Sequence, residues 1–494
     1  MSSSLPFPAD AVESGSKREF GFFAVVVIAV LAATQSADPG VMNIALSSVS
    51  KDLGIQGFGL SLAASVGTLS LAATVIAVGA LADRIGVRKV IMIGLVLEMV
   101  GNIVVAISPD FTVLIIGRII AGVGMGALFA GAFSMVPEIA GKKGIPKVIG
   151  QWTGMLYVLL IVFSVIGSVL IGINWRLGFV LVPAICLVML FVVPAALPET
   201  SRRGAKEFDT LGLCTLGLGM VLLLLGVSFA AVSLTSPLFW GTILIGLVLL
   251  GLWAVIEGKS RKASFPIRLF KSPIFVAAVL AGILWNFGES VMQLQSANFW
   301  QKVVEVPAGV VGVSQMPFLL AAVVAGFLGG ALLAKGRSPV IVMSVGFIMM
   351  VVGTLSVAFT TVETTIVAFI PFLVLVGGGM VLVAVVQARE YVAEAPAKYL
   401  SAVVSSRTSV GQLGYSLGVA LTSTIITIGI TKEDGSVSTD PALYSAAFNT
   451  AMLATAGILI VGGIIAAILL AIGLKRRPNA AAVDSPEMLP DPVN

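Results

Sequence analysis

The amino-acid sequence predicts an all-α polytopic membrane protein with fourteen transmembrane helices. Of its 494 residues, 58% are hydrophobic and 11% are charged, whereas soluble domains have about 45–50% apolar and about 25% charged residues. The apolar residues gather in fourteen blocks, each close to the roughly 20 residues that a helix needs to cross a bilayer. These blocks account for most of the apolar residues, which excludes a soluble or disordered chain and predicts almost no extramembrane domain.

Short connections separate the expected spans, and most contain charged residues, glycine or proline. Ser108-Pro109-Asp110 and Gly336-Arg337-Ser338-Pro339 are two examples, and both combine residues that favour turns. We place the spans at residues 20–46, 58–82, 89–107, 112–136, 149–172, 177–197, 211–231, 238–256, 273–299, 308–334, 339–359, 366–386, 400–430 and 448–473.

Basic residues are distributed unequally between the two sides of the membrane. With a cytoplasmic N-terminus, 23 of the 29 Lys and Arg residues fall in cytoplasmic loops and tails. The positive-inside rule then predicts a cytoplasmic membrane protein with both termini in the cytoplasm. The net charge of +5 therefore reflects orientation and does not indicate a nucleic-acid partner. The other basic residues are Lys51, Arg176, Lys302 and Lys432 outside, and Arg118 and Arg407 within spans.

A short repeat divides the chain into two halves. Gly79-Ala80-Leu81-Ala82-Asp83-Arg84 ends the second span, and Gly330-Ala331-Leu332-Leu333-Ala334-Lys335 ends the tenth. Two six-helix halves fit this spacing only if two helices are inserted between them; the alternative is a chance match. Repeated halves around a midplane site are typical of secondary transporters. We expect a disordered tail at 1–16, a six-helix bundle at 17–205, a two-helix insertion with a cytoplasmic linker at 206–272, a second six-helix bundle at 273–477 and a disordered tail at 478–494.

The loop at residues 79–89 contains the most specific sequence motif in the chain. Gly79 and Gly86 permit close helix approach and a sharp turn, while Asp83 can accept backbone hydrogen bonds or pair with Arg84 or Arg88. An ordinary turn between two helices is the alternative. The loop resembles the G-x-x-x-D-R-x-G-x-R-K motif of the major facilitator superfamily. That resemblance implies a gating loop that latches the two halves in the outward-facing state.

Four other segments narrow the resemblance to the fourteen-helix drug:proton antiporters of that superfamily. This resemblance implies the major facilitator fold, in this case two six-helix bundles plus two inserted helices. The same resemblance implies proton-coupled export of small molecules. It also implies that Arg118 supports proton coupling near Asp38 and that Asn43 belongs to the substrate site. The segments are Asp38-Pro39-Gly40-Val41-Met42-Asn43-Ile44-Ala45-Leu46, Arg118 to Gly126, Trp175-Arg176, and Leu197-Pro198-Glu199 with Phe208-Asp209-Thr210-Leu211-Gly212.

The sequence also departs from that family's pattern. The Gly-Pro pair of the fifth helix is replaced by Phe163-Ser164, the first-helix Thr by Gly40 and the fourth-helix Gln by Ala121. These changes put the antiport stoichiometry and the usual drug range in doubt, but not the fold.

Among the charged residues within spans, four stand out: Asp38, Glu98, Arg118 and Glu289. A charge at mid-bilayer costs about 2.5–3.5 kcal/mol on insertion scales, so such residues usually face a cavity or a partner. The chain has no histidine, and any proton carrier in the membrane is therefore expected to be a carboxylate. We expect these four residues to couple protons to transport. The alternatives are a solvated Asp38 at the outer mouth and a purely structural Arg118.

Glu289 lies on a polar helical stripe, with Trp285, Gln293, Ser296 and Trp300 at helical spacing. An acid between two indoles suits an organic cation through Coulomb attraction and cation–π contact. We expect Glu289, Trp285, Gln293 and Ser296 to bind substrate. In the alternative, Trp300 is an interfacial residue and Glu289 pairs with the helix that bears Arg407.

Other chemistry is not supported. The sequence has no P-loop and no nucleophile–base motif, and Cys186 and Cys214 lie at no metal spacing. We therefore expect no enzyme, no cofactor and no metal, with a small molecule, protons and the bilayer as partners of a monomer. The predicted function is proton-coupled export of amphipathic, cationic small molecules. The alternatives are export of a small polar metabolite such as a diamine or amino acid, and a membrane sensor or scaffold without transport.

Overall fold

The computed structural model describes residues 21–55, 57–200, 209–230, 236–260, 263–306, 308–432 and 436–476. These residues are almost entirely helical, and fourteen of the helices are long and apolar enough to cross a membrane. The predicted fold class and number of spans are confirmed. The expected tails 1–16 and 478–494 lie outside the described residues.

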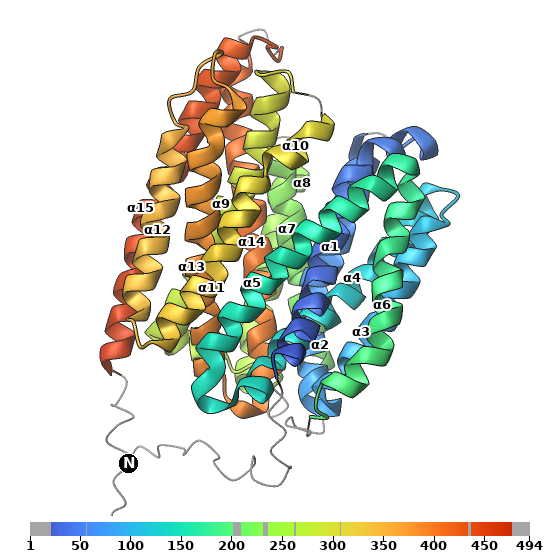
Figure 1. The fold of residues 1–494 in the computed structure, drawn as a ribbon, viewed down its shortest axis with the longest axis vertical. Coiled ribbons are helices and arrows are strands. Elements are labelled where there is room, and N and C mark those ends of the chain that lie inside the picture. The colour runs from blue at the N-terminus through green and yellow to red at the C-terminus, as the bar shows by residue number, and fades with distance from the viewer. Residues whose placement is uncertain are drawn as a thin grey trace, which may run out of the picture.

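Six helices form the N-terminal bundle (Figure 1). They pack mainly in the pairs α3–α4, α2–α4, α1–α5 and α3–α6. The bundle consists of α1 (Phe22–Leu53), α2 (Gly57–Ile85), α3 (Val87–Ala106), α4 (Phe111–Ser134), α5 (Val136–Ile173) and α6 (Trp175–Ala196).

The C-terminal bundle contains the remaining long helices of the second half (Figure 1). Its tenth span is divided at Gln315, because Pro317 in the first turn of α11 cannot donate the backbone hydrogen bond that would continue α10. The elements are η2 (Ile267–Lys271), α9 (Pro273–Lys302), α10 (Ala308–Ser314), α11 (Met316–Ala334), α12 (Pro339–Ser356), η3 (Ile366–Phe369), α13 (Ile370–Glu394), η4 (Ala397–Tyr399), α14 (Leu400–Ile430) and α15 (Pro441–Arg476).

Two further helices, α7 (Thr210–Ala230) and α8 (Pro237–Lys259), lie between the bundles in sequence. Helix α7 packs on α2 and on α14, whereas α8 packs chiefly on α7. The outer side of α8 is apolar, with Leu244 and Val248 more than half exposed, as expected of a helix that faces lipid.

The bundles meet at the proximal end, which we define as the end where α1 begins and α15 ends. They diverge toward the opposite, distal end (Figure 1). Glycines permit the closest approach: a Cβ on Gly150 of α5 would lie 2.4 Å from the Cα of Gly330 on α11. Small residues let helix backbones come together in this way. Gly330 belongs to the repeat found in the sequence, so the repeated segment lies at a contact between the bundles.

Candidate functional site

A buried ion pair joins α1 to α4 in the N-terminal bundle. Arg118 Nη1 donates a hydrogen bond to Asp38 Oδ1, and both side chains are 0% exposed. Asn102 Nδ2 on α3 donates a hydrogen bond of 2.8 Å to Asp38 Oδ2. Pro39 follows the acid inside α1, where its ring removes one backbone hydrogen bond from the helix. Asp38 is therefore sealed from solvent in this state, which excludes a solvated position at the membrane surface.

Glu98 on α3 completes the acid cluster, which we define as Asp38, Glu98, Asn102 and Arg118. Glu98 is 0% exposed, and neither of its carboxyl oxygens has a hydrogen-bond partner in the part of the chain that the structure describes. It interacts electrostatically with both Asp38 and Arg118, so two carboxyl groups share one guanidinium. With both acids ionised, the cluster would carry a net negative charge away from water, which is strongly unfavourable. One proton would make the cluster neutral.

Two glycines allow helices to close around the acid cluster. A Cβ on Gly67 of α2 would lie 2.6 Å from Arg118 Nη2, and a Cβ on Gly124 of α4 would lie 2.4 Å from the backbone nitrogen of Glu98. A larger residue at Gly67 would displace the guanidinium of Arg118, and one at Gly124 would push α3 and α4 apart. The close packing of α2, α3 and α4 is therefore part of what seals the cluster.

Glu289, Trp285 and Gln293 share a partly exposed face of α9 in the middle of its span. Gln293 Nε2 donates a hydrogen bond of 3.1 Å to Glu289 Oε1, and the other carboxylate oxygen has no partner among the described residues. Tyr157 of α5 and Tyr415 of α14 both interact electrostatically with Glu289. Since α5 belongs to the N-terminal bundle, this face of α9 lies at the boundary between the bundles.

The structure does not bring the other predicted stripe residues to that boundary. Ser296 is 0% exposed, and its hydroxyl donates to the backbone oxygen of Met292 on the same helix. Trp300 is also fully buried, with its ring centroid 5.5 Å from that of Phe369. It is thus a core residue of the C-terminal bundle, not an interfacial one. Asn43, the other residue predicted for the substrate site, is exposed on α1.

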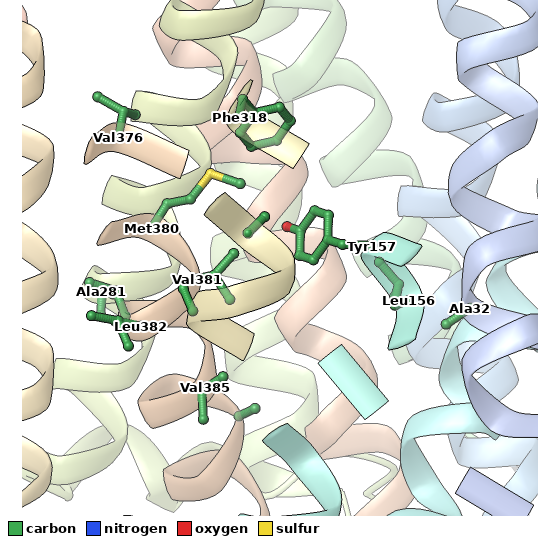
Figure 2. Close-up of a cluster of buried hydrophobic side chains, with 14 of the residues drawn as sticks. Ala32, Leu156, Tyr157, Ala281, Phe318, Val376, Met380, Val381, Leu382 and Val385 are labelled. Carbon is green, nitrogen blue, oxygen red and sulfur yellow. The ribbon is translucent and has the colours of Figure 1, made fainter. Parts of the chain in front are cut away.

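Tyr157 extends from the N-terminal bundle toward the C-terminal bundle. Leu156 faces Ala32 of α1, whereas Tyr157 projects from α5 toward α11 (Figure 2). Its ring meets Phe318 of α11 edge-on, with centroids 6.2 Å apart. Helix α5 therefore contacts its own bundle through one side and the opposite bundle through the other.

Arg407 of α14 is held beside Trp285 by Gln387 of α13. Gln387 Oε1 accepts hydrogen bonds from Arg407 Nε and from Trp285 Nε1, each of 2.9 Å. The guanidinium carbon lies 5.6 Å from the ring centroid of Trp285 and 5.4 Å from that of Phe133 on α4. No ion pair joins Arg407 to Glu289 within the described part of the chain. Gln387 could not be identified from the sequence, because one amide in an apolar helix forms no pattern.

Asp83 of the gating loop caps α14 across the two bundles. Its two carboxylate oxygens accept hydrogen bonds of 3.1 Å from the backbone N–H groups of Ser401 and Ala402. The first N–H groups of a helix have no partner within it and favour a negative charge. A Cβ on Gly79 would lie 2.4 Å from Ser405 Oγ, so glycine permits the approach. These backbone donors are among the partners expected for Asp83.

The remainder of the gating loop holds the end of α6. Gly86 has a positive φ of 100°, which glycine adopts without strain, and the next backbone N–H donates a hydrogen bond of 2.7 Å to Thr200 Oγ1. Arg88 Nη1 donates to the backbone oxygen of Leu197 at 3.3 Å. The gating loop and the Leu197-Pro198-Glu199 text, far apart in sequence, are therefore adjacent.

The inserted helices place two buried carboxyl groups beside the gating loop. Arg84 Nη2 donates a hydrogen bond of 3.3 Å to Ser264 Oγ, and the backbone N–H of Ser264 donates to Glu257 Oε1. Among the described residues no donor reaches Glu257 Oε2 or Asp209 Oδ2, and each lies 2.8 Å from the position a Cβ would take on Gly212. Asp209, which the sequence analysis used only as part of the family resemblance, therefore lies close to the 79–89 loop.

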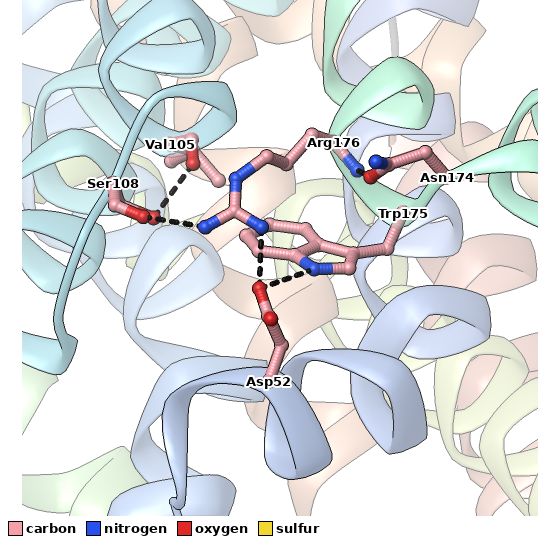
Figure 3. A network of polar contacts seen from close by, with 6 residues as sticks. All are labelled: Asp52, Val105, Ser108, Asn174, Trp175 and Arg176. Atoms are coloured by element: carbon pink, nitrogen blue, oxygen red, sulfur yellow. Dashed lines mark hydrogen bonds and ion pairs between the residues drawn. The ribbon is translucent and has the colours of Figure 1, made fainter.

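A polar network ties the distal ends of α1, α3 and α6 together (Figure 3). Asp52 Oδ2 accepts a hydrogen bond of 3.0 Å from Trp175 Nε1 and another from Arg176 Nη1. Arg176 Nη2 also donates to the backbone oxygen of Ser108 at 3.0 Å. The hydrogen bond from Arg176 holds the pKa of Asp52 below its usual value, with help from the indole. The network gives the Trp175-Arg176 pair a structural role at the start of α6, which Asn174 caps by accepting a hydrogen bond from the backbone N–H of Arg176.

Two helical bundles that meet at one end, with unpaired charges at their boundary, define a membrane transporter. The chain belongs to the Major Facilitator Superfamily, whose family model matches residues 25–419. It is therefore a multi-pass transporter of that superfamily and not an enzyme. Transporters of this superfamily carry small-molecule substrates, usually with ions.

Several curated relatives are bacterial drug-efflux proteins by name. The chain is 25% identical over 397 residues to the multidrug transporter protein MdtP of Bacillus subtilis, covering 79% of this chain and 72% of that one. It is 26% identical over 447 residues to the putative multidrug resistance protein MdtD of Serratia proteamaculans, covering 86% and 87%. It is 24% identical over 400 residues to the quinolone resistance protein NorB of Staphylococcus aureus, covering 78% and 84%.

Solved structures share the fold. The human organic anion transporter MFSD10 superposes with a TM-score of 0.63 at 12% identity, covering 92% of this chain and all of that one. The Escherichia coli fucose:proton symporter FucP gives a TM-score of 0.62 at 14% identity, covering 92% and 99%.

Proposed function

We propose that the chain is a proton-coupled exporter of amphipathic small molecules that carry a cationic group. The observation that carries this proposal is the acid cluster, in which Asp38 and Glu98 share the single guanidinium of Arg118 and all three are fully buried. A neutral cluster contains one proton. A movement that opens the cluster to one side of the membrane and then to the other lets that proton leave and be replaced.

We place the proximal end in the cytoplasm, because 23 of the 29 basic residues are predicted on that side. In that orientation both chain termini are cytoplasmic, and the present state faces outward. Two contacts support this assignment, because they close the bundles proximally: Asp83 on the first turn of α14, and Gly150 against Gly330. Both contacts must open for the transporter to face the cytoplasm.

The substrate would bind at the boundary between the bundles. Glu289 offers a carboxylate oxygen without a partner, and Trp285 one turn earlier offers an aromatic face. Together they suit a cation by Coulomb attraction and cation–π contact. The multidrug and quinolone-resistance names of relatives at 24–26% identity support a drug-like substrate.

One proton supplies enough free energy for export. An ion that crosses 100 mV releases about 2.3 kcal/mol, and one pH unit adds about 1.4 kcal/mol. Each tenfold step in concentration requires about 1.4 kcal/mol, so one proton per substrate sustains a gradient of several hundredfold for a substrate without net charge. For a monovalent cation the exchange moves no net charge, and the pH term alone sustains about tenfold.

The test is transport into inverted proteoliposomes with an imposed pH gradient, using lipophilic cations, diamines and amino acids. We expect uptake of lipophilic cations to follow the gradient in the wild type and to be lost in Asp38→Asn. Asp110→Asn is the matched control, because Asp110 is an exposed N-cap of α4 that asparagine replaces well. Normal proton-driven uptake by Asp38→Asn would remove Asp38 from the mechanism, and no uptake of any compound by the wild type would refute the proposed function.

A further inference from the structure

Arg407 is a second charge at the substrate boundary, and the proposed cation site does not use it. The residue is 8% exposed and lies within a span, in the first third of α14. A guanidinium there requires an anion or access to a polar space. Its Nε is bound to Gln387, but its two terminal nitrogens have no acceptor among the described residues. Neither nitrogen is completely shielded from solvent, so both reach accessible space.

The side chain of Arg407 is held in place by neighbouring residues. A Cβ on Gly282 would lie 2.1 Å from Gln387 Nε2, so glycine on α9 makes room for the amide. Gln387 then accepts hydrogen bonds from both Arg407 and Trp285. The amide fixes the guanidinium against the indole, and Phe133 of α4 borders it from the opposite bundle. The guanidinium is therefore presented at the boundary that also holds Glu289.

Glu289 and Arg407 do not neutralise each other by contact. They interact electrostatically, yet no ion pair within 4.0 Å connects them in the described chain. A ligand with only a cationic group would satisfy Glu289 but leave Arg407 unpaired and repulsive. A ligand with one ammonium and one carboxylate satisfies both. Guanidinium groups bind carboxylates through two parallel hydrogen bonds, which also fixes the ligand's orientation.

We propose that the boundary site selects amphipathic zwitterions, binding the ammonium group at Glu289 and the carboxylate at Arg407. The aromatic body of such a ligand lies against Trp285, and Tyr157 borders it from α5. This inference rests on the proposed function, because it specifies the substrate class of the same site. It assigns to Arg407 the role of a specificity-determining residue.

The test measures binding to the full-length protein in detergent, with three probes that share one aryl-piperazine body. The first probe is the free carboxylic acid, which is a zwitterion. The second is its methyl ester, which is only a cation, and the third is its N-acetyl acid, which is only an anion. Quenching of Trp285 fluorescence reports binding, and Trp285→Phe identifies that signal among the six tryptophans. We expect the wild type to bind the zwitterion at least about tenfold more tightly than either relative.

Variants separate recognition from a structural role. Arg407→Gln is expected to remove the preference for acid over ester, because only the carboxylate contact is lost, and Arg407→Lys to restore part of it. Glu289→Gln is expected to remove the preference for the amine over its N-acetyl form. Arg337→Gln, on an exposed turn, is the control and keeps both preferences. Equal loss of all three probes in Arg407→Gln, with no rescue by lysine, would show a structural role and overturn the proposal.

The outcomes also distinguish this inference from the proposed function. Equal affinity of the wild type for acid and ester, or no binding of any probe, overturns the zwitterion site. If the ester is nevertheless driven by a pH gradient in proteoliposomes, the exporter proposal stands without it. If the zwitterion is preferred in binding but no probe is transported, the site stands and the proton-coupled function fails.

Discussion

Removing the two acids of the acid cluster singly and together tests how it balances charge. Asp38 is paired with Arg118, and Glu98 lies within electrostatic reach of both without a hydrogen-bond partner. Glu98→Gln replaces a neutral carboxyl group by an amide of the same size. We therefore expect it to lower the free energy of unfolding by less than about 1 kcal/mol, within the range of a substitution that removes no pairing.

Asp38→Asn leaves Arg118 without its carboxylate partner. Breaking a buried ion pair by removing one partner costs about 3–5 kcal/mol when the other charge is left uncompensated. Here Glu98 can release its proton and become the counter-ion, so the single variant is expected to lose only about 1–2 kcal/mol, the scale of replacing a charged hydrogen bond by a weaker one. The double variant Asp38→Asn/Glu98→Gln has no counter-ion left, and the full loss of about 3–5 kcal/mol is expected.

The assay is reversible unfolding in mixed micelles of a mild detergent and dodecyl sulfate, followed by helical circular dichroism. The coupling between the two acids is the loss in the double variant minus the sum of the single losses. We expect a coupling of at least about 1 kcal/mol, with the double variant worse than the sum. Strict additivity, or a Glu98→Gln variant as unstable as Asp38→Asn, would refute the sharing of one guanidinium by two acids.

Three further predictions concern the ends of the molecule. Asp83→Ala removes two charged hydrogen bonds to the first turn of α14, worth about 1.5–3 kcal/mol each at most. A cysteine placed in that contact should then be alkylated from the proximal side about tenfold faster or more. An unchanged rate would mean that the contact does not stabilise the closed proximal end. Gly150→Ala places a Cβ 2.4 Å from Gly330 and should shift spin-label distances toward a wider proximal end, whereas Gly172→Ala, with open space around it, should leave them unchanged. The pKa of Asp52 is lowered on folding, so its carboxylate stabilises the folded protein when it is ionised. The stability lost in Asp52→Asn should therefore be constant above about pH 5 and disappear as the pH falls below the ordinary pKa of 3.8. A loss of stability that grows on acidification would contradict a lowered pKa.

The architecture and part of the site could be predicted from the sequence because their signals are local. Blocks of apolar residues located fourteen helices, and a charge inside such a block is conspicuous wherever it occurs. Asp38, Glu98 and Arg118 were each identified in this way. The structure adds that they meet, with α1, α3 and α4 bringing together residues up to 80 positions apart.

The polar partners could not be predicted, because a neutral side chain in an apolar helix carries no pattern. Asn102 and Gln387 are examples, since each acts only through contacts with other helices. Helical periodicity also predicted a polar stripe on α9 that is longer than the one in the structure. Trp300 lies fifteen residues beyond Trp285, about 60° around a helix of 3.6 residues per turn, and there α9 packs into the aromatic core of its own bundle.

The central claim is that substrate binding and protonation of the acid cluster are linked. Proton release on substrate addition, measured with purified protein in weakly buffered detergent, tests this most directly. We expect about one proton to be released per bound substrate in the wild type and in Asp110→Asn, and little or none in Asp38→Asn/Glu98→Gln at matched folding. Substrate binding without proton release in the wild type, or undiminished release in the double variant, would contradict it.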